Sequence, residues 1–323
     1  MKNHTNNNRI NSPSENSGIK PIRHAPNAWS VTQMIDQAPR GMMIRELVKN
    51  GIEAAQRSAT KGSPGRIVFD SFLDSNASGR VAKLRIFNTG PGMDAAELEK
   101  VMDLHSTSGG KANGAGQNFG LGAKLTGLVN NPAGIRYRSC KGGIVSEAIL
   151  CKEGNDYGIR LQKDQGGVMS PVVDRTREAK KERRDVRFDW TEVVLFGEDA
   201  AHDTTAEPFG KGKRSASNWI ADCVNNRFDE LPNHVSIEID SSLERGTRKQ
   251  SRSLHGSRRT VKQSARHGSQ QTVSLNGGVE VRFTILGKKG QNRYALGGHI
   301  ALVHNSELYA MRMGKEWGRT ASR

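Results

Sequence analysis

The chain has 323 residues, of which 34% are hydrophobic and 36 are glycine, so it is long enough for one large or two ordinary domains and part of it is expected to be loop. It has no run near the roughly 18 apolar residues of a membrane span, no apolar signal segment, and three cysteines without metal-ligand spacing. We therefore expect a cytoplasmic protein without membrane contact.

The net charge of +16 is concentrated toward the C-terminus. Residues 241–323 hold 16 Lys and Arg against 4 Asp and Glu, whereas residues 29–240 are almost neutral. A positive field of this kind favours a polyanionic partner, nucleic acid above all. A solvating tail or a surface for an acidic protein would produce the same composition.

The first half of the chain is predicted to combine helices with a pair of strands. Residues 1–28 are rich in Asn, Ser and Pro and are expected to be disordered. A capping box of Asp94 and Glu97 should open a helix that reaches about residue 104. The segment 105–119 is too polar to pack and has the composition of a mobile lid. The other elements expected here are helices at 31–37, 42–58 and 121–129 and strands at 67–69 and 81–87.

The second half is predicted to be mostly strands. The pattern indicates successive strands of an antiparallel sheet at 134–139, 144–151, 157–162 and 187–196, with a charged linker or helix at 175–184. A helix at 217–228 and a strand at 235–239 should close a domain that spans residues 29–240. We expect a basic low-complexity linker at 241–271 and then a β-rich region, 272–323, with strands at 279–286, 294–303 and 308–311.

One predicted helix has an unusual polar face. In the stretch from Arg45 to Ala55, Glu46, Asn50 and Glu53 follow one another at intervals of four and three residues, so they share one face of the helix. A solvated polar face is the ordinary explanation. Two glycine-rich stretches favour a binding site instead: residues 88–93 (Asn-Thr-Gly-Pro-Gly-Met) follow an apolar strand, and residues 114–124 open a helix.

Together, these three stretches resemble the N-box, G1-box and G2-box of the GHKL ATPases, the superfamily of gyrase, the large heat-shock chaperones, sensor histidine kinases and MutL-type mismatch-repair proteins. The motif style is closest to the chaperone, microrchidia and MutL-type branch. The resemblance covers about residues 29–240. It implies an α+β fold of the Bergerat type, a two-layer sandwich in which helices cover one face of a mixed, mainly antiparallel sheet. The small basic β-rich region that follows would be a partial transducer-like segment.

The resemblance gives each motif residue a role toward ATP and Mg²⁺. Glu46 matches the carboxylate that orients the attacking water, Asn50 would ligate Mg²⁺, and Glu53 would support the adenine end through water. Backbone amides at the start of the 121–129 helix would face the phosphates. The remaining expected nucleotide contacts are Asn88, Gly90, Gly92 and Met93 at the base, Ser106, Thr107 and Lys111 in the lid, Gly120, Leu121, Gly122, Ala123 and Lys124 at the phosphates, and Thr191. Lys111 and Lys124 could equally be solvated.

Two positions depart from the family pattern. Relatives carry Asp where this chain has Asn88, and an Asn side chain can either accept from an adenine amino group or donate to a guanine carbonyl, which leaves base preference open. Glu53 also stands where the family has Asp. Thr191 matches the threonine that hydrogen-bonds the G1-box acid, so its partner here would be Asn88.

The predicted function is Mg²⁺-dependent ATP binding and hydrolysis that drives lid closure and an ATP-dependent homodimer clamp. Histidine kinases usually carry Asn where this chain has Glu46, which argues against a kinase. Lys288 or Lys289 could complete the site, and the basic C-terminal region would couple the cycle to nucleic acid. Two alternatives stay open: a nucleotide-gated, chaperone-like protein-binding module, and a pseudo-ATPase that binds nucleotide without hydrolysing it.

Overall fold

The computed structural model describes residues 28–60, 62–76, 79–103, 122–209, 214–244, 250–286 and 299–313. The helices in these ranges are α1 (Ala28–Asp36), α2 (Met43–Ser58), α3 (Ala95–Met102), α4 (Gly122–Leu128), α5 (Thr176–Lys181), α6 (Ala216–Asn225) and α7 (Ser257–Ser264), with 3₁₀ turns at Arg40–Met42 and Ser241–Leu243. Among these helices, none is both long and apolar enough to cross a membrane.

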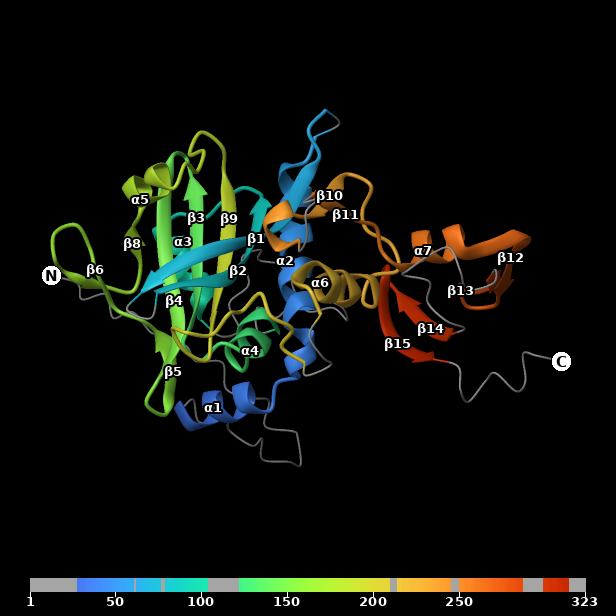
Figure 1. Cartoon of the computed structure of the whole chain (residues 1–323), viewed down its shortest axis with the longest axis horizontal. Helices are drawn as coiled ribbons and strands as arrows, with labels where there is room; N and C mark the ends of the chain where they lie inside the picture. The colour runs from blue at the N-terminus through green and yellow to red at the C-terminus, as the bar shows by residue number, and fades with distance from the viewer. Residues whose placement is uncertain are drawn as a thin grey trace, which may run out of the picture.

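The strands of the described ranges build one large sheet and three small ones (Figure 1). The large sheet has the order β11-β10-β1-β2-β9-β3-β4-β5, and β8 pairs with β4. Its strands are β1 (Gly65–Asn76), β2 (Gly79–Thr89), β3 (Gly134–Lys141), β4 (Ile144–Glu153), β5 (Asp156–Ile159), β8 (Val173–Asp174), β9 (Trp190–Gly197), β10 (Val235–Ile239) and β11 (Arg252–Leu254). The small sheets pair β6 (Gln162–Lys163) with β7 (Met169–Ser170), β12 (Ala265–Leu275) with β13 (Val279–Leu286), and β14 (His299–His304) with β15 (Glu307–Met313).

The large sheet is mixed and mainly antiparallel, as predicted. Strands β1 and β10 run parallel, with Gly65 opposite Val235, whereas the other described pairs of this sheet are antiparallel. The fold class, an α+β sandwich of the Bergerat type, is therefore confirmed.

Helix α2 lies on the covered face of this sheet, over β1, β2 and β10, and it also contacts α4 and α6. Its apolar residues recur every three or four positions, so Ile44, Val48 and Ala55 point into the main core. Alternation along the strands supplies the other half of that core, for example Ile67 of β1 and Ile86 of β2. This packing holds one face of α2 against the sheet and leaves its other faces to α4 and to the C-terminal region.

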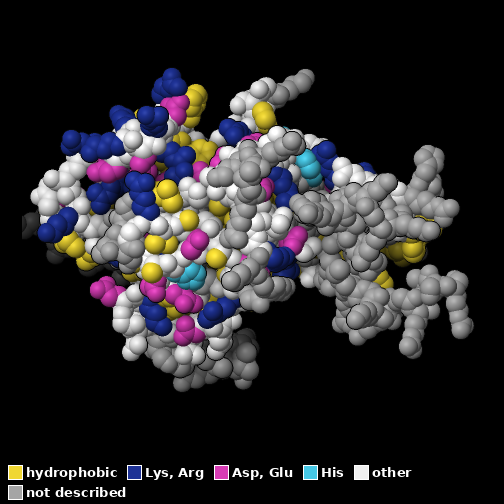
Figure 2. All heavy atoms as spheres, in the orientation of Figure 1, with side chains coloured by type: hydrophobic (Ala, Val, Ile, Leu, Met, Phe, Trp, Pro, Cys, Tyr) yellow, Lys and Arg dark blue, Asp and Glu magenta, His cyan; other side chains and the backbone are white. Residues whose placement is uncertain are grey.

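The second face of the sheet carries a small apolar cluster under α5, formed by Cys140, Val145, Ala179 and Trp190. Helix α5 thus covers part of the face that was expected to be bare of helices. Exposed Arg and Lys residues lie on α5 and just after it: Arg177, Lys180, Lys181 and Arg183. Figure 2 shows Lys and Arg side chains gathered over this part of the molecule.

A buried ionic network lies next to that cluster. The side chain of Glu192 on β9 is fully buried, and its carboxylate lies 2.8 Å from Arg184, 3.7 Å from Arg136, 3.9 Å from Arg138 and 4.0 Å from Arg85. Arg136 and Arg138 point to this face because Ile135 and Tyr137, which alternate with them on β3, belong to the main core.

The C-terminal region contains more regular structure than expected. No element was predicted in 241–271, yet β11 pairs with β10 at the edge of the large sheet, and α7 and the first part of β12 follow. The predicted strand at 279–286 is β13. The strand predicted at 294–303 is observed as His299–His304 in β14, with the earlier residues outside the described ranges.

Candidate functional site

Helix α2 carries the predicted N-box, and Glu46 lies in its first turn. A carboxylate there is favoured by the helix dipole. The side chain of Glu46 is only 10% exposed, and its Oε1 accepts a hydrogen bond from Nη1 of Arg45. Asn50 is half-buried one turn further along, and Glu53 is exposed. The structure therefore makes Glu46 a nearly buried, ion-paired carboxylate.

The predicted G2-box meets the N-box at this carboxylate. A Cβ atom placed on Gly122, the first residue of α4, would lie 2.5 Å from Cδ of Glu46 and closer still to Oε2. Only glycine lets the Glu46 carboxylate lie against the start of α4 in this way. Ala123 follows in the first turn of α4 and is buried in the main core. Two motifs far apart in the sequence thus form one surface.

The G1-box turn after β2 is enclosed by α2 on one side and β3 on the other. A Cβ on Gly90 would lie 3.1 Å from Cβ of Ala54 in α2. Gly92 has a φ angle of +61°, and a Cβ there would lie 2.8 Å from the carbonyl carbon of Cys140 and closer still to its oxygen. Gly92 is therefore required by close backbone approach and by its φ angle, whereas Gly90 is tightly packed against α2.

Hydrogen bonds connect the G1-box to two neighbouring strands. The amide of Met93 donates to Oγ of Ser139 on β3 at 2.8 Å, and that hydroxyl lies 2.8 Å from Oγ1 of Thr191 on β9. Thr191 stands opposite Asn88 in the β2–β9 pairing, and Nδ2 of Asn88 donates to the carbonyl of Thr89 at 3.0 Å. The structure thus brings Asn88, Met93 and Thr191 together.

Ser139 is a member of this group that the sequence reasoning missed. It shares the covered face of β3 with the core residues Ile135 and Tyr137. The signal that could have identified it was a hydroxyl in line with two apolar residues of a predicted strand, and the structure shows that this hydroxyl is fully buried.

Lys124 of α4 is buried rather than solvated. Its ammonium donates to the backbone carbonyl of Asp103, just after α3. Desolvation lowers the pKa of Lys124 to about 8, although the nearby Asp103 carboxylate acts in the opposite direction. The side chain therefore ties the end of α3 to α4.

Several predicted contacts lie outside the described residues. These are the lid segment 105–119 with Ser106, Thr107 and Lys111, the G2-box residues Gly120 and Leu121, and the C-terminal candidates Lys288 and Lys289.

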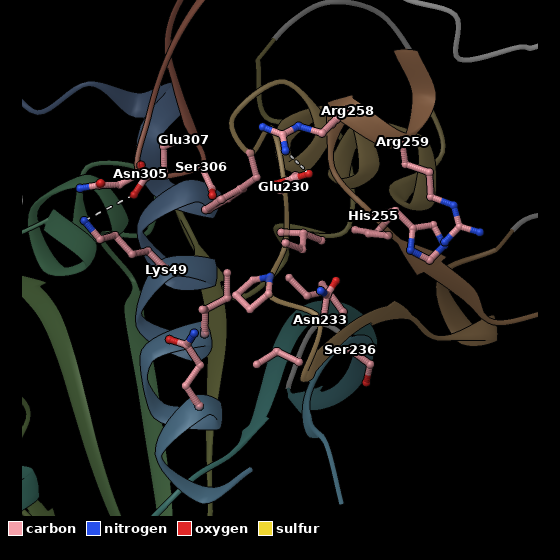
Figure 3. Close-up of a pocket in the computed structure, with 18 of the residues that line it drawn as sticks. Lys49, Glu230, Asn233, Ser236, His255, Arg258, Arg259, Asn305, Ser306 and Glu307 are labelled. Carbon is pink, nitrogen blue, oxygen red and sulfur yellow. Dashed lines mark ion pairs between the residues drawn. The ribbon is translucent and has the colours of Figure 1, made fainter. Parts of the chain in front are cut away.

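A pocket of about 1070 Å³ opens between α2, the β10–β11 region, α7 and the β14–β15 hairpin (Figure 3). Lys49, Glu53 and Gln56 form its α2 wall, and Glu307 of β15 lies opposite Lys49. None of the described G1-box or G2-box residues lines it. Glu53 therefore faces a different space from the one that Glu46 shares with Gly122.

Residues 36–142, which contain all three motifs, match the family model described as "Histidine kinase-, DNA gyrase B-, and HSP90-like ATPase". This segment is a GHKL-type ATPase domain.

A search of curated proteins found no match. Among solved structures, the chain is similar to the ATPase and transducer domains of DNA topoisomerase II from Balamuthia mandrillaris, at 13% identity and a TM-score of 0.39, with 73% of this chain and 53% of that chain covered. The chain thus spans about half the length of that structure.

Proposed function

We propose that this chain binds ATP with Mg²⁺ and hydrolyses it. The observation that carries the proposal is the contact between Glu46 and Gly122 inside a GHKL-type ATPase segment. It places a nearly buried carboxylate against the start of the helix that the G2-box opens. Hydrolysis of a phosphoanhydride needs a group that orients water at the phosphate, and a fixed carboxylate can do so.

The residues present fit the expected nucleotide and metal. Glycine at 90, 92 and 122 lets α2, β2, β3 and α4 approach one another closely, so that the three motifs converge on one place. The amide oxygen of Asn50 is a suitable hard ligand for Mg²⁺, which completes its coordination with phosphate oxygens and water. When bound, Mg²⁺ would neutralise charge on the phosphates.

Each of three side chains has its own role in this proposal. Glu46, held by Arg45 at Oε1, orients water from its other oxygen. Asn88 contacts the base: one N–H of its Nδ2 donates to Thr89, and its Oδ1 can accept a hydrogen bond from the amino group of adenine. Met93, fixed through Ser139, packs on the base.

We extend the proposal to a cytoplasmic, ATP-dependent homodimer whose lid closure is coupled to nucleic acid. Support for a nucleic-acid partner comes from the charge of the C-terminal region and from the exposed Arg259 and Lys262 of α7.

The first test is phosphate release from ATP and from GTP with Mg²⁺. We expect ATP turnover in the unaltered chain and its loss in Glu46→Gln, with nucleotide affinity retained. Glu99→Gln is the control, since Glu99 is an exposed carboxylate on α3. Nucleotide binding without turnover in the unaltered chain would contradict hydrolysis and support the binding-only alternative.

Binding of fluorescent duplex DNA at increasing salt tests the partner. We expect log Kd to change steeply with log salt concentration, and Arg259→Glu to weaken binding and reduce that slope by about one. Lys100→Glu on α3 is the charge-matched control. No binding even at low salt would favour the nucleotide-gated protein-binding alternative.

A further inference from the structure

The tip of the C-terminal hairpin touches the helix that carries the candidate catalytic carboxylate. Oε2 of Glu307 accepts a hydrogen bond from Nε of Arg45 at 2.7 Å and a second from its Nη2. Oε1 of Glu307 lies 3.5 Å from Nζ of Lys49, the pair drawn as a dashed line in Figure 3. One carboxylate from near the end of the chain therefore pairs with two cations on successive turns of α2.

Arg45 is shared between two carboxylates. Its Nη1 donates to Glu46, while Nε and Nη2 donate to Glu307. The side chains of Arg45, Glu46 and Glu307 are 13%, 10% and 12% exposed, so water screens these charges little. With Lys49 the cluster holds two positive and two negative charges, and removal of Glu307 would leave Arg45 with Glu46 as its remaining carboxylate in this cluster.

The backbone of the hairpin fixes Glu307 in this place. The amide of Leu308 donates to the carbonyl of Arg227 at 2.8 Å, and the amide of Asp229 donates to the carbonyl of Ser306 at 2.8 Å. Leu308 itself is buried. Asn305 and Ser306 have φ angles of +49° and +63°, as in a two-residue hairpin turn that follows the twist of the strands. The contact is thus made by a docked element.

We propose that Glu307 is a positioning residue for Glu46 and that docking of the hairpin sets the rate of ATP hydrolysis. Glu307 engages two donors of Arg45 together with Lys49. It thereby keeps Arg45 from drawing the Glu46 carboxylate away from Gly122. Without Glu307, Arg45 can turn a second donor to Glu46 and form a bidentate pair, which withdraws the oxygen that orients water. This inference rests on the proposed hydrolytic function.

The test is steady-state ATP turnover by Glu307→Gln in the full chain, with Glu280→Gln on the neighbouring β12–β13 hairpin as control. Glu280 is exposed. We expect kcat to fall about tenfold in Glu307→Gln with KM changed by less than about twofold, because nucleotide contacts are untouched. Glu280→Gln should behave as the unaltered chain.

A double variant separates positioning from support of the fold. In Arg45→Met with Glu307→Gln, the cation that competes for Glu46 is gone, so kcat should recover toward that of Arg45→Met alone. Unfolding in urea should show non-additive effects of the two substitutions, whether or not the chain hydrolyses ATP. A merely structural role would give the same non-additive unfolding but no recovery of kcat.

The outcomes separate this inference from the function on which it rests. Normal turnover of the unaltered chain with unchanged kcat in Glu307→Gln would overturn the inference alone. Additive effects on unfolding would also overturn the inference, since they would show that Arg45 and Glu307 do not interact in solution. No turnover in the unaltered chain would overturn both proposals.

Discussion

Glu46 of α2 and Gly122 of α4 lie so close together that no side chain larger than hydrogen fits at position 122 without displacing the carboxylate. A Cβ there would come within 2.5 Å of Cδ of Glu46 and within 3.1 Å of its Cγ. Since the atoms in the way are the end of a side chain rather than backbone, they can move. The position of Glu46 is therefore more sensitive to residue 122 than the fold is.

Gly122→Ala is expected to abolish ATP turnover while changing the free energy of unfolding by less than about 1 kcal/mol, because alanine suits a helix and the displaced group is flexible. Phosphate release and urea unfolding measure the two effects. Gly158→Ala on β5, where a Cβ would meet nothing within 4 Å, is the control. Normal turnover in Gly122→Ala would show that the carboxylate does not act from its present position.

Gly92→Ala should both destabilise the chain and weaken nucleotide binding. The substitution places a side chain at a positive φ angle and against the carbonyl of Cys140, which is backbone and cannot move aside. Gly142→Ala separates these causes, because Gly142 has a φ angle of +59° and open space around it. We expect about 1 kcal/mol lost in Gly142→Ala from the φ angle alone and clearly more in Gly92→Ala. Equal losses in urea unfolding would contradict a tight G1-box turn.

Glu192→Gln should lower the free energy of unfolding by about 3–5 kcal/mol, since it leaves buried arginines without their shared counter-charge. Glu182→Gln is the comparison within the same network. Glu182 is 32% exposed and pairs with Arg138, which keeps Glu147 at 2.5 Å. Glu182→Gln should therefore lower the free energy of unfolding by markedly less than Glu192→Gln. Similar losses in both variants would show that the burial of Glu192 does not determine the size of the effect.

Stability should rise with pH between about 8 and 10.5 because of Lys124. Its pKa is lowered from 10.5 to about 8 in the folded chain, so in this window the unfolded chain holds a proton that the folded chain has lost. The free energy of unfolding then increases with pH across this window. Above both pKa values the amine is neutral in both states, so the destabilising effect of burying its charge is gone. Urea unfolding of the unaltered chain and of Lys124→Met across this window should give diverging curves. Parallel curves would place the pKa of Lys124 near its ordinary value.

Local patterns in the sequence predicted the fold class and most of the helices before residue 241, but not α7. The capping box of α3 is present with both of its hydrogen bonds, each 3.0 Å long, because it needs only residues three apart. Helix α2 follows from its apolar period. The parallel pairing of β1 with β10 and the strand β11 had no such signal, since strand order depends on contacts between distant segments.

The candidate site also has a part that the sequence predicted and a part that it did not. The spacing of Glu46, Asn50 and Glu53 and the two glycine stretches were enough to predict which segments converge, and the contact of Glu46 with Gly122 agrees with that prediction. Glu307 could not be predicted, because nothing in its neighbourhood distinguishes it from any surface carboxylate. Its role depends on where a hairpin docks, which is a property of the folded chain.

The parallel pairing of β1 with β10 has a consequence for synthesis of the protein. Arg66 of β1 and its ion-pair partner Glu238 of β10 are 172 residues apart. At roughly 5–20 residues per second, a ribosome needs about 10–30 s to make the second strand after the first. During that interval the outer edge of β1 has no neighbour and can pair with strands of other nascent chains. We expect this edge to be where the emerging polypeptide most needs a chaperone.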